Sequence, residues 1–339
     1  MKKTILLQIV ICSLLILHIS FLSAPNVCAA TVIKVSLITP EGSAWTNALY
    51  QMAEKVEKRT NGEVQFKIYA GGISGDETDV LRKMGANRIH AAGFSGVGLG
   101  VLLPEIRILE APLLYRNYDE IDRVKEALTP EFQTELNKKG YILLGFAEAG
   151  FVRFFSKVQM TGPQNFEPLK MWVWKDDPVA KDSLEALGIK TYPLNLTDVN
   201  TGLETGMINS FYSPPLAAIA FQWYAKIQYM LDYPMVNSTG AFVIKKSTFE
   251  RLSPQNQEIL RQETDQFCRE LISQARHQNE ESLDVLREAG ITFETPSPRQ
   301  IELFEDSAHK IYDSSIDRLY SKALFEKVNA IIADQRAGK

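Results

Sequence analysis

Residues 31–69 read TVIKVSLITPEGSAWTNALYQMAEKVEKRTNGEVQFKIY, and this stretch decides the fold class. Val32–Leu37 is a β-branched run that predicts a strand, and Val64–Tyr69 alternates apolar and polar side chains as a half-buried strand does. Between them, Trp45–Val56 carries apolar residues at helical spacing, and a typical helix end follows at Thr60–Gly62. A strand, a helix and a second strand in this order indicate an α/β fold with a largely parallel sheet.

The same alternation continues along the chain. Further strands are expected at 89–92, 141–146, 171–173, 191–193 and 211–212, and helices at 76–86, 118–128, 132–139, 181–187, 199–205 and 216–224. The segment Pro254–Ala289 differs, because it is long, charged and free of Gly or Pro after its first residue. With Ser253 as the N-cap and Gly290 as the stop, it predicts one helix that can bridge two lobes.

The first thirty residues form a separate segment. Two lysines lead into the apolar run Ile5–Leu22, and the small residues Cys28, Ala29 and Ala30 follow, which is the layout of a secretory signal peptide cleaved after Ala30. A permanent transmembrane helix is the alternative interpretation. Lipid attachment at Cys28 is disfavoured but stays open, since Val27 is not the small residue that such a site requires before its cysteine.

Charge and cysteine content limit the partners and the compartment. Loss of residues 1–30 removes two of the 37 basic side chains and none of the 41 acidic ones, which leaves a net charge of −6. This mild acidity argues against nucleic acid as a partner. Cys268 is the only cysteine beyond residue 30, so no internal disulfide is expected. About 309 residues remain, enough for two domains of roughly 100–200 residues each, and we expect a soluble mature protein.

No catalytic or metal-binding constellation is recognisable. His90, His277 and His309 are far apart and have no Cys or acidic partner at ligand spacing, which argues against a zinc site. We therefore predict neither a metal nor a cofactor.

A glycine-rich segment follows the strand expected at 89–92. Its glycines are Gly93, Gly96, Gly98 and Gly100. Their spacing is not that of a dinucleotide-binding loop, and no P-loop lysine follows. Ser95 misses the nucleophile-elbow pattern because Val97 stands where that pattern has its last glycine. We interpret the segment as a flexible loop that lets the backbone approach a ligand.

Aromatic side chains concentrate in the second half of the chain. They are Phe154, Phe155, Trp172, Trp174, Phe211, Tyr212, Trp223 and Tyr224, with Arg153 beside them. Trp172 and Trp174 alternate on one expected strand and therefore lie on the same face of it. Core packing is one interpretation of these rings. A ligand pocket is the other, since pockets are mostly apolar with a few polar groups.

Four segments together carry a family resemblance. Lys58–Val64, followed by a strand and a glycine-rich loop, matches a K-T-N-G-x-V pattern, and Pro104–Leu113 matches a P-E…P-F/L pattern. Leu187–Gly206 matches an L-G-A-x-x-x-P…A-L-x-x-G pattern, and the long helix at 254–289 also fits. In order and spacing, the chain resembles the extracytoplasmic solute receptors of TRAP (tripartite ATP-independent periplasmic) transporters.

This resemblance implies a fold of the periplasmic-binding-protein type. Two α/β lobes with mixed, mostly parallel sheets are joined by crossing hinge strands and spanned by a long helix. They close over a solute, most often a small organic acid, and present it to a membrane permease.

One departure from the family pattern concerns ligand charge. The family's arginine in its G-L-K-I-R-V strand forms a two-pronged salt bridge with the ligand carboxylate. The matching segment here is Pro168–Val173, so Trp172 stands in the arginine's place. The family's D-G-x-E-N-P run becomes Asn209–Pro214, with Phe211 and Tyr212 replacing polar groups. Since an indole carries no charge, both changes favour an apolar or aromatic ligand.

Arg153 keeps a second interpretation open. It lies near a second arginine that some family members use, so a carboxylate held by Arg153 with its body on Trp172 is the alternative. Arg153 is equally compatible with an interlobe salt bridge, for which Glu148 is a candidate partner, or with a solvated strand end.

We therefore predict a signal peptide at 1–30, one lobe at 31–150 plus 236–280, and a second lobe at 151–235 plus 281–339. The predicted site between them comprises Trp172, Trp174, Phe211 and Tyr212 as ring walls, Arg153 and Ser213 as polar contacts, and Trp45 and Phe94 from the first lobe. The predicted function is that of a periplasmic receptor for a small molecule, which it delivers to TRAP membrane permease subunits. An enzyme on the same scaffold and a lipid- or protein-binding scaffold are the rivals.

Overall fold

The computed structural model describes residues 30–161 and 166–338 of the chain. Residues 1–29 of the predicted signal peptide, Cys28 among them, therefore lie outside the described residues. Within the described part, nine strands form one mixed sheet with the order β2-β1-β3-β8-β4-β7-β5-β6, and β9 lies beside β8. The strands are β1 (Thr31–Ser36), β2 (Val64–Tyr69), β3 (Ala91–Ser95), β4 (Tyr141–Ser156), β5 (Lys170–Trp174), β6 (Lys190–Leu194), β7 (Ser210–Ser213), β8 (Tyr229–Lys245) and β9 (Thr292–Glu294).

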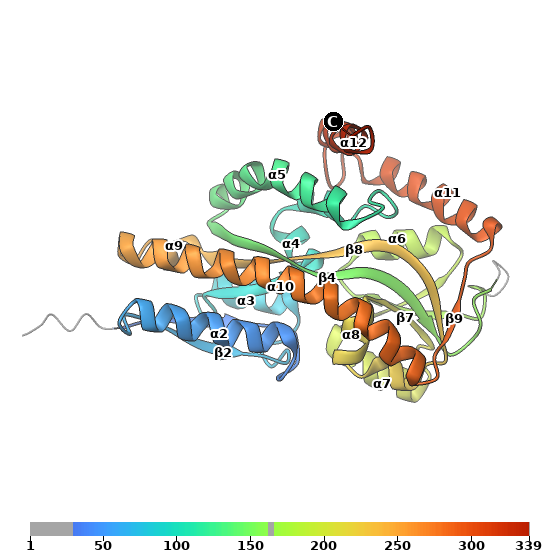
Figure 1. The fold of residues 1–339 in the computed structure, drawn as a ribbon, viewed down its shortest axis with the longest axis horizontal. Helices are drawn as coiled ribbons and strands as arrows, with labels where there is room; N and C mark the ends of the chain where they lie inside the picture. Colours follow the sequence, from blue (N-terminus) through green and yellow to red (C-terminus); the bar gives the residue numbers. More distant parts are fainter. Residues whose placement is uncertain (1–29, 162–165, 339) are drawn as a thin grey trace, which may run out of the picture.

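Helices cover both faces of this sheet (Figure 1). They are α2 (Ala44–Arg59), α3 (Glu77–Gly85), α4 (Gly96–Leu102), α5 (Tyr118–Lys138), α6 (Pro178–Ala186), α7 (Val199–Thr205), α8 (Pro215–Ala220), α9 (Lys246–Phe249), α10 (Pro254–Glu288), α11 (Pro298–Ser315) and α12 (Lys322–Arg336). The helix expected in two pieces at 118–128 and 132–139 is continuous as α5, with Pro130 inside it. None of the helices in the described ranges has both the length and the apolar character that crossing a membrane requires.

The two long strands β4 and β8 join two lobes. They pair antiparallel along almost their whole length, from Tyr141 opposite Lys245 to Ser156 opposite Tyr229. At one end β8 also pairs with β3 of the first lobe, and at the other end β4 pairs with β7 of the second lobe (Figure 1). The sheet is therefore continuous through both lobes, and β4 and β8 are the crossing hinge strands that the family resemblance implies.

The first lobe shows why the opening segment folds as expected. Ile33 and Val35 of β1 are fully buried, and Leu49 and Val56 of α2 pack against them. Ser43 caps α2, because its side chain accepts a hydrogen bond from the Thr46 N–H. Apolar residues spaced for one face of a helix thus bury the face of a parallel sheet.

Helix α10 crosses both lobes, whereas the C-terminal helix returns to the first one. The expected division assigned residues 281–339 to the second lobe. In the structure α12 lies beside α5 (Figure 1). Lys327 pairs there with Glu131 at 2.9 Å, and Arg336 pairs with Glu120 at 2.8 Å. The buried face of α12 packs both on α5 and on nearby residues such as Tyr312 and Tyr320, so its place in a lobe depends on the tertiary structure.

The glycine-rich segment is not a flexible loop. Gly96–Leu102 forms the helix α4, and its glycines allow charged side chains to approach the helix closely. A Cβ at Gly96 would overlap the Glu110 carboxylate, one at Gly98 would lie 2.6 Å from a Glu77 oxygen, and one at Gly100 would lie 2.8 Å from Arg107. These glycines serve close packing inside the first lobe.

Glu77 is one of these buried charged residues. Its carboxylate accepts hydrogen bonds from the Ser95 and Gly98 N–H groups, both at 2.7 Å, and from the Ser95 hydroxyl at 2.8 Å. Burial nevertheless raises the pKa of Glu77 to about 7, because desolvation outweighs these three bonds.

A bulge in β4 fixes the hinge to α10. Gly150 adopts φ +109°, at the point where β4 shifts its register against β8. There the Asn279 side chain of α10 donates to the Ala149 carbonyl at 2.7 Å and accepts from the Leu216 N–H at 3.0 Å. A Cβ at Gly150 would overlap the Asn279 amide. The hinge therefore requires glycine both for its conformation and for its contact with α10.

We predict that Gly150→Ala lowers the free energy of unfolding by about 2–4 kcal/mol, since a positive φ and an overlap are both penalised. The matched control is Gly188→Ala, which also has positive φ but has no atom within 4 Å of the added Cβ. It should cost only about 1 kcal/mol. Denaturant titration measures both values, and equal losses would show that the contact with Asn279 contributes nothing.

A second prediction concerns Glu77. Between the ordinary carboxyl pKa and about 7, the native state keeps a proton that the unfolded chain has lost, so the free energy of unfolding should fall as pH rises through this window, by up to about 1.4 kcal/mol per pH unit. In Glu77→Gln this slope should be smaller, although the variant is less stable at every pH. Denaturation at several pH values between 5 and 8 tests this, with the exposed Glu54→Gln as control. A slope unchanged by Glu77→Gln would contradict the assignment.

Candidate functional site

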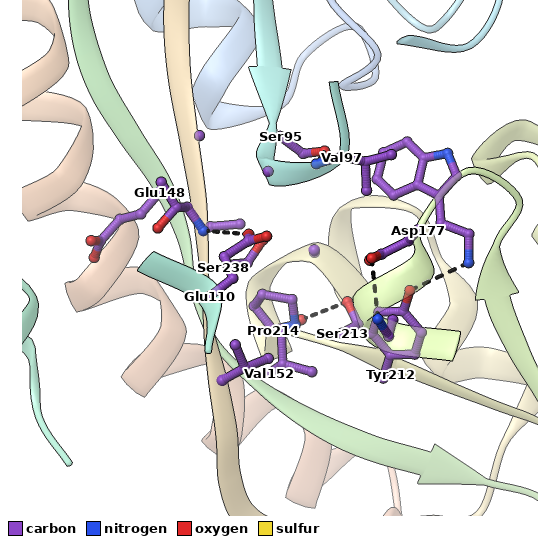
Figure 2. A pocket seen from close by; sticks show the side chains of 18 of the residues that line it. Ser95, Val97, Glu110, Glu148, Val152, Asp177, Tyr212, Ser213, Pro214 and Ser238 are labelled. Carbon is purple, nitrogen blue, oxygen red and sulfur yellow. Dashed lines mark hydrogen bonds between the residues drawn. The ribbon is translucent and has the colours of Figure 1, made fainter. Parts of the chain in front are cut away.

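A cavity of about 260 Å³ lies where the two lobes and the hinge strands meet. The first lobe contributes Leu37–Thr39 after β1 and Gly93–Val97 at the junction of β3 and α4. The second lobe contributes Tyr212–Pro214 from β7 and its end, together with side chains of β5. In Figure 2, Ser95 and Val97 lie on one side of the space and Tyr212 and Ser213 on the other, with Glu110 and Glu148 at its edge.

Six of the eight predicted site residues line this cavity. They are Trp45, Phe94, Trp172, Trp174, Tyr212 and Ser213. Arg153 and Phe211 are not among the lining residues. Phe211 is fully buried behind the wall, where its ring stacks on Phe155 at 4.9 Å.

Stacked rings form the wall of the second lobe. Trp172, which is only 2% exposed, stacks on Tyr212 at a centroid distance of 5.1 Å and meets Trp223 edge-on at 5.3 Å. Trp172 and Trp174 lie on the same face of β5, as their alternation predicts, with ring centroids 6.1 Å apart. All four tryptophans of the chain line the cavity. Trp223 was not in the predicted site, although its place in the aromatic concentration was a signal for it.

Arg153 is engaged elsewhere. Its Nε lies 3.0 Å from a carboxylate oxygen of Asp232, on the neighbouring strand β8. Glu148 is therefore not its partner. Glu148 is fully buried and pairs instead with Lys125 at 2.8 Å and Arg276 at 2.6 Å. Arg153 does form a salt bridge, but its partner Asp232 belongs to the same lobe, so neither the interlobe pairing nor the partner Glu148 expected from the sequence is found.

A buried ion cluster forms the polar side of the cavity. Arg107 lies 3.0 Å from Glu110 through Nη1 and 2.7 Å from Asp177 through Nη2. Burial raises the pKa of Glu110 to about 7, against the opposing effect of Arg107. The spacing of Arg107 and Glu110 within an apolar run was the sequence signal that we missed. Asp177 also had a signal, since it precedes a proline at the start of a helix.

Hydrogen bonds across the cavity hold the lobes together. Asp76 of the first lobe accepts from the Trp174 Nε1–H at 3.0 Å and from the Leu196 N–H at 3.2 Å, and both donors belong to the second lobe. The pair between Arg107 and Asp177 makes the same connection. The structure therefore represents a closed arrangement of the lobes around the cavity.

The lining chemistry suits retention of a solute. No histidine or cysteine lies among the lining residues that the structure describes, and those residues contain no group of His, Cys, Asp and Glu side chains suited to a metal ion. The Ser213 hydroxyl donates to the Pro214 carbonyl at 3.0 Å instead of to a base. The cavity thus offers aromatic faces and buried charged groups to a solute.

Comparison with known proteins agrees with this geometry. Residues 35–319 match the model of the bacterial extracellular solute-binding proteins, family 7. The C4-dicarboxylate-binding periplasmic protein of Rhodobacter capsulatus is 22% identical over 312 residues, covering 89% of this chain and 92% of that protein. A solute-binding protein of Verminephrobacter eiseniae is 27% identical over 234 residues, covering 68% of this chain and 69% of that protein.

The fold has close structural neighbours as well. A TRAP periplasmic solute-binding protein of Ralstonia eutropha, solved with bound (S)-2-acetolactate, superposes with a TM-score of 0.84 at 21% identity and covers 90% of this chain and 99% of its own. The family model matches most of the chain, and the structure has two lobes of this type with a cavity between them. These observations lead to one assignment. The chain belongs to family 7 of the bacterial extracellular solute-binding proteins, the periplasmic receptors of TRAP transporters, and it is a receptor for small molecules and not an enzyme.

Proposed function

We propose that this chain is exported, cleaved after Ala30 and takes up an uncharged, largely apolar or aromatic solute in its interlobe cavity. The closed receptor then presents this solute to the permease subunits of a TRAP transporter. The relatives named above bind a C4-dicarboxylate and acetolactate, which are anions. The proposal therefore assigns this chain a different ligand charge on the same scaffold.

The charged side chains that line the cavity are the main support for the proposed ligand class. Four carboxylates line the cavity, against a single basic residue, Arg107, among the described residues. The four are Glu77, Glu110, Glu148 and Asp177. Lys125 and Arg276 offset the charge of Glu148, and Arg107 is shared between Glu110 and Asp177. A carboxylate solute would lose its hydration here and meet like charges without a free guanidinium, which disfavours its binding.

The tryptophans support an apolar ligand for a separate reason. The Trp172 Nε1–H already donates to the Leu194 carbonyl at 3.1 Å, and the Trp174 Nε1–H donates to Asp76. An indole has only one donor, so neither ring has one left for a ligand. What these residues offer is the ring face, which favours apolar and aromatic groups.

The alternatives require changes in this arrangement. A carboxylate at Arg153 requires that side chain to leave Asp232 and turn into the cavity. A lipid- or protein-binding scaffold requires exposed rings, whereas Trp45, Phe94 and Trp172 are all buried.

Native mass spectrometry of the purified mature protein, followed by denaturing extraction of whatever it carries, tests the proposal directly. We expect a co-purified neutral and apolar or aromatic molecule. Recovery of a small carboxylate would overturn the proposed ligand class while leaving the family assignment intact.

We predict that Trp172→Arg loses affinity for the co-purified solute by about tenfold or more, because it removes a central buried aromatic contact. The same variant should gain affinity for small carboxylates, since it restores the charge that the family pattern has at this position. Trp172→Phe is the matched control and should keep more of the original affinity. Calorimetric titration measures both, after circular dichroism has established that each variant is folded. A variant with neither the gain nor the loss would show that Trp172 is not part of the binding site.

A further inference from the structure

Arg107 is held on two sides by carboxylates from different lobes. Its Nη1 lies 3.0 Å from Glu110 in the first lobe, and its Nη2 lies 2.7 Å from Asp177 in the second lobe. The Arg107 side chain is only 6% exposed, and its stem packs against Gly100 of α4. Its Nε–H has no hydrogen-bond partner. The guanidinium therefore lines the cavity with two of its edges occupied.

We propose that Glu110 and Asp177 are the specificity-determining residues of this receptor, which exclude carboxylate solutes by occupying the guanidinium that such a solute would bind. This inference rests on the proposed function and names the side chains responsible for it. Removal of the two negative charges should convert the cavity into one that accepts carboxylates.

Backbone hydrogen bonds keep both carboxylates in place. Glu110 accepts from the Thr239 N–H of β8 at 2.9 Å. Asp177 caps α6, since it accepts from the Val179 and Ala180 N–H groups, both at 3.1 Å. Neither side chain can turn away from Arg107 without losing these bonds.

An incoming carboxylate therefore competes at a disadvantage. It would have to displace one of two carboxylates that are already positioned, and the displaced group would stay buried without its cation, which is strongly unfavourable. Displacement of Asp177 would also break a connection between the lobes. A neutral solute does not compete for Arg107 and meets none of these costs.

The structure allows the charges to be removed with little change of shape. In Glu110→Gln and Asp177→Asn the side-chain carbonyl can still accept from the same backbone N–H groups. Asparagine is also a good N-cap, so α6 should keep its start. Arg107 then keeps its positive charge but loses both anionic partners.

The experiment is calorimetric titration of the Glu110→Gln/Asp177→Asn variant with two anionic probes, 3-phenylpropionate and succinate, and with the neutral probe 3-phenylpropanol. Titrations at pH 8 lie above the pKa of Glu110 of about 7, so that most of the Glu110 side chains are ionised in the wild type. We expect the affinity for at least one anionic probe to rise about tenfold or more over the wild-type value or its detection limit. A tenfold rise in affinity is about what one additional charge-assisted hydrogen bond to the probe provides.

Asp232→Asn is the matched control, because it releases Arg153, which does not line the cavity. It should gain no affinity for either anion. A folded double variant without a gain, or an equal gain in Asp232→Asn, overturns the inference. If the double variant does not fold, the two single variants decide in the same way, each with a smaller expected gain. Tight binding of the anionic probes by the wild type would instead overturn the proposed ligand class, which separates the two failures.

Discussion

The antiparallel pairing of β4 with β8 is the interaction on which the rest of the structure depends. One ladder of hydrogen bonds runs through both lobes, so each lobe completes its sheet with half of the same two strands. Without this pair the first lobe would keep only β2-β1-β3 and the second only β7-β5-β6, as two separate sheets. The cavity lies beside the middle of the ladder, where Ala147–Ala149 of β4 and Ser238–Gly240 of β8 form part of its wall. Movement between the lobes therefore has to be absorbed at this place.

The positions that require glycine and the buried charged side chains lie in the same region, around the hinge and the cavity. The bulge at Gly150 lets Asn279 of α10 bind the hinge, and the glycines of α4 let Glu77, Arg107 and Glu110 pack against a short helix. Burial of these charged groups is unfavourable because they lose their hydration. Hydrogen bonds from backbone N–H groups and ion pairs among the charged groups offset this loss. The result is a cavity with paired charged groups on its polar side and aromatic rings on the other.

The sequence predicted the fold well because its signals were local. Strand and helix periodicities at 31–69, and the cap at Ser253 with the stop at Gly290, depend on residues close in the chain. The place of α12 was not predictable in this way, since its partner α5 lies nearly two hundred residues earlier. For the candidate site, aromatic residues were easier to find than charged ones. Trp172 and Tyr212 stood out by type, whereas the local signals at Arg107 and Asp177 do not reveal that these two side chains meet between the lobes.

The placement of all four tryptophans in the cavity wall has an optical consequence. Ultraviolet emission from indole depends on the polarity around the ring, and here every indole ring of the chain borders the same cavity. Replacement of water by an apolar guest should change the colour and intensity of the whole protein's fluorescence, and an aromatic guest stacked on Trp172 should quench it. The receptor thus contains its own unlabelled reporter of occupancy, suited to searching extracts and compound collections for the molecule that it carries.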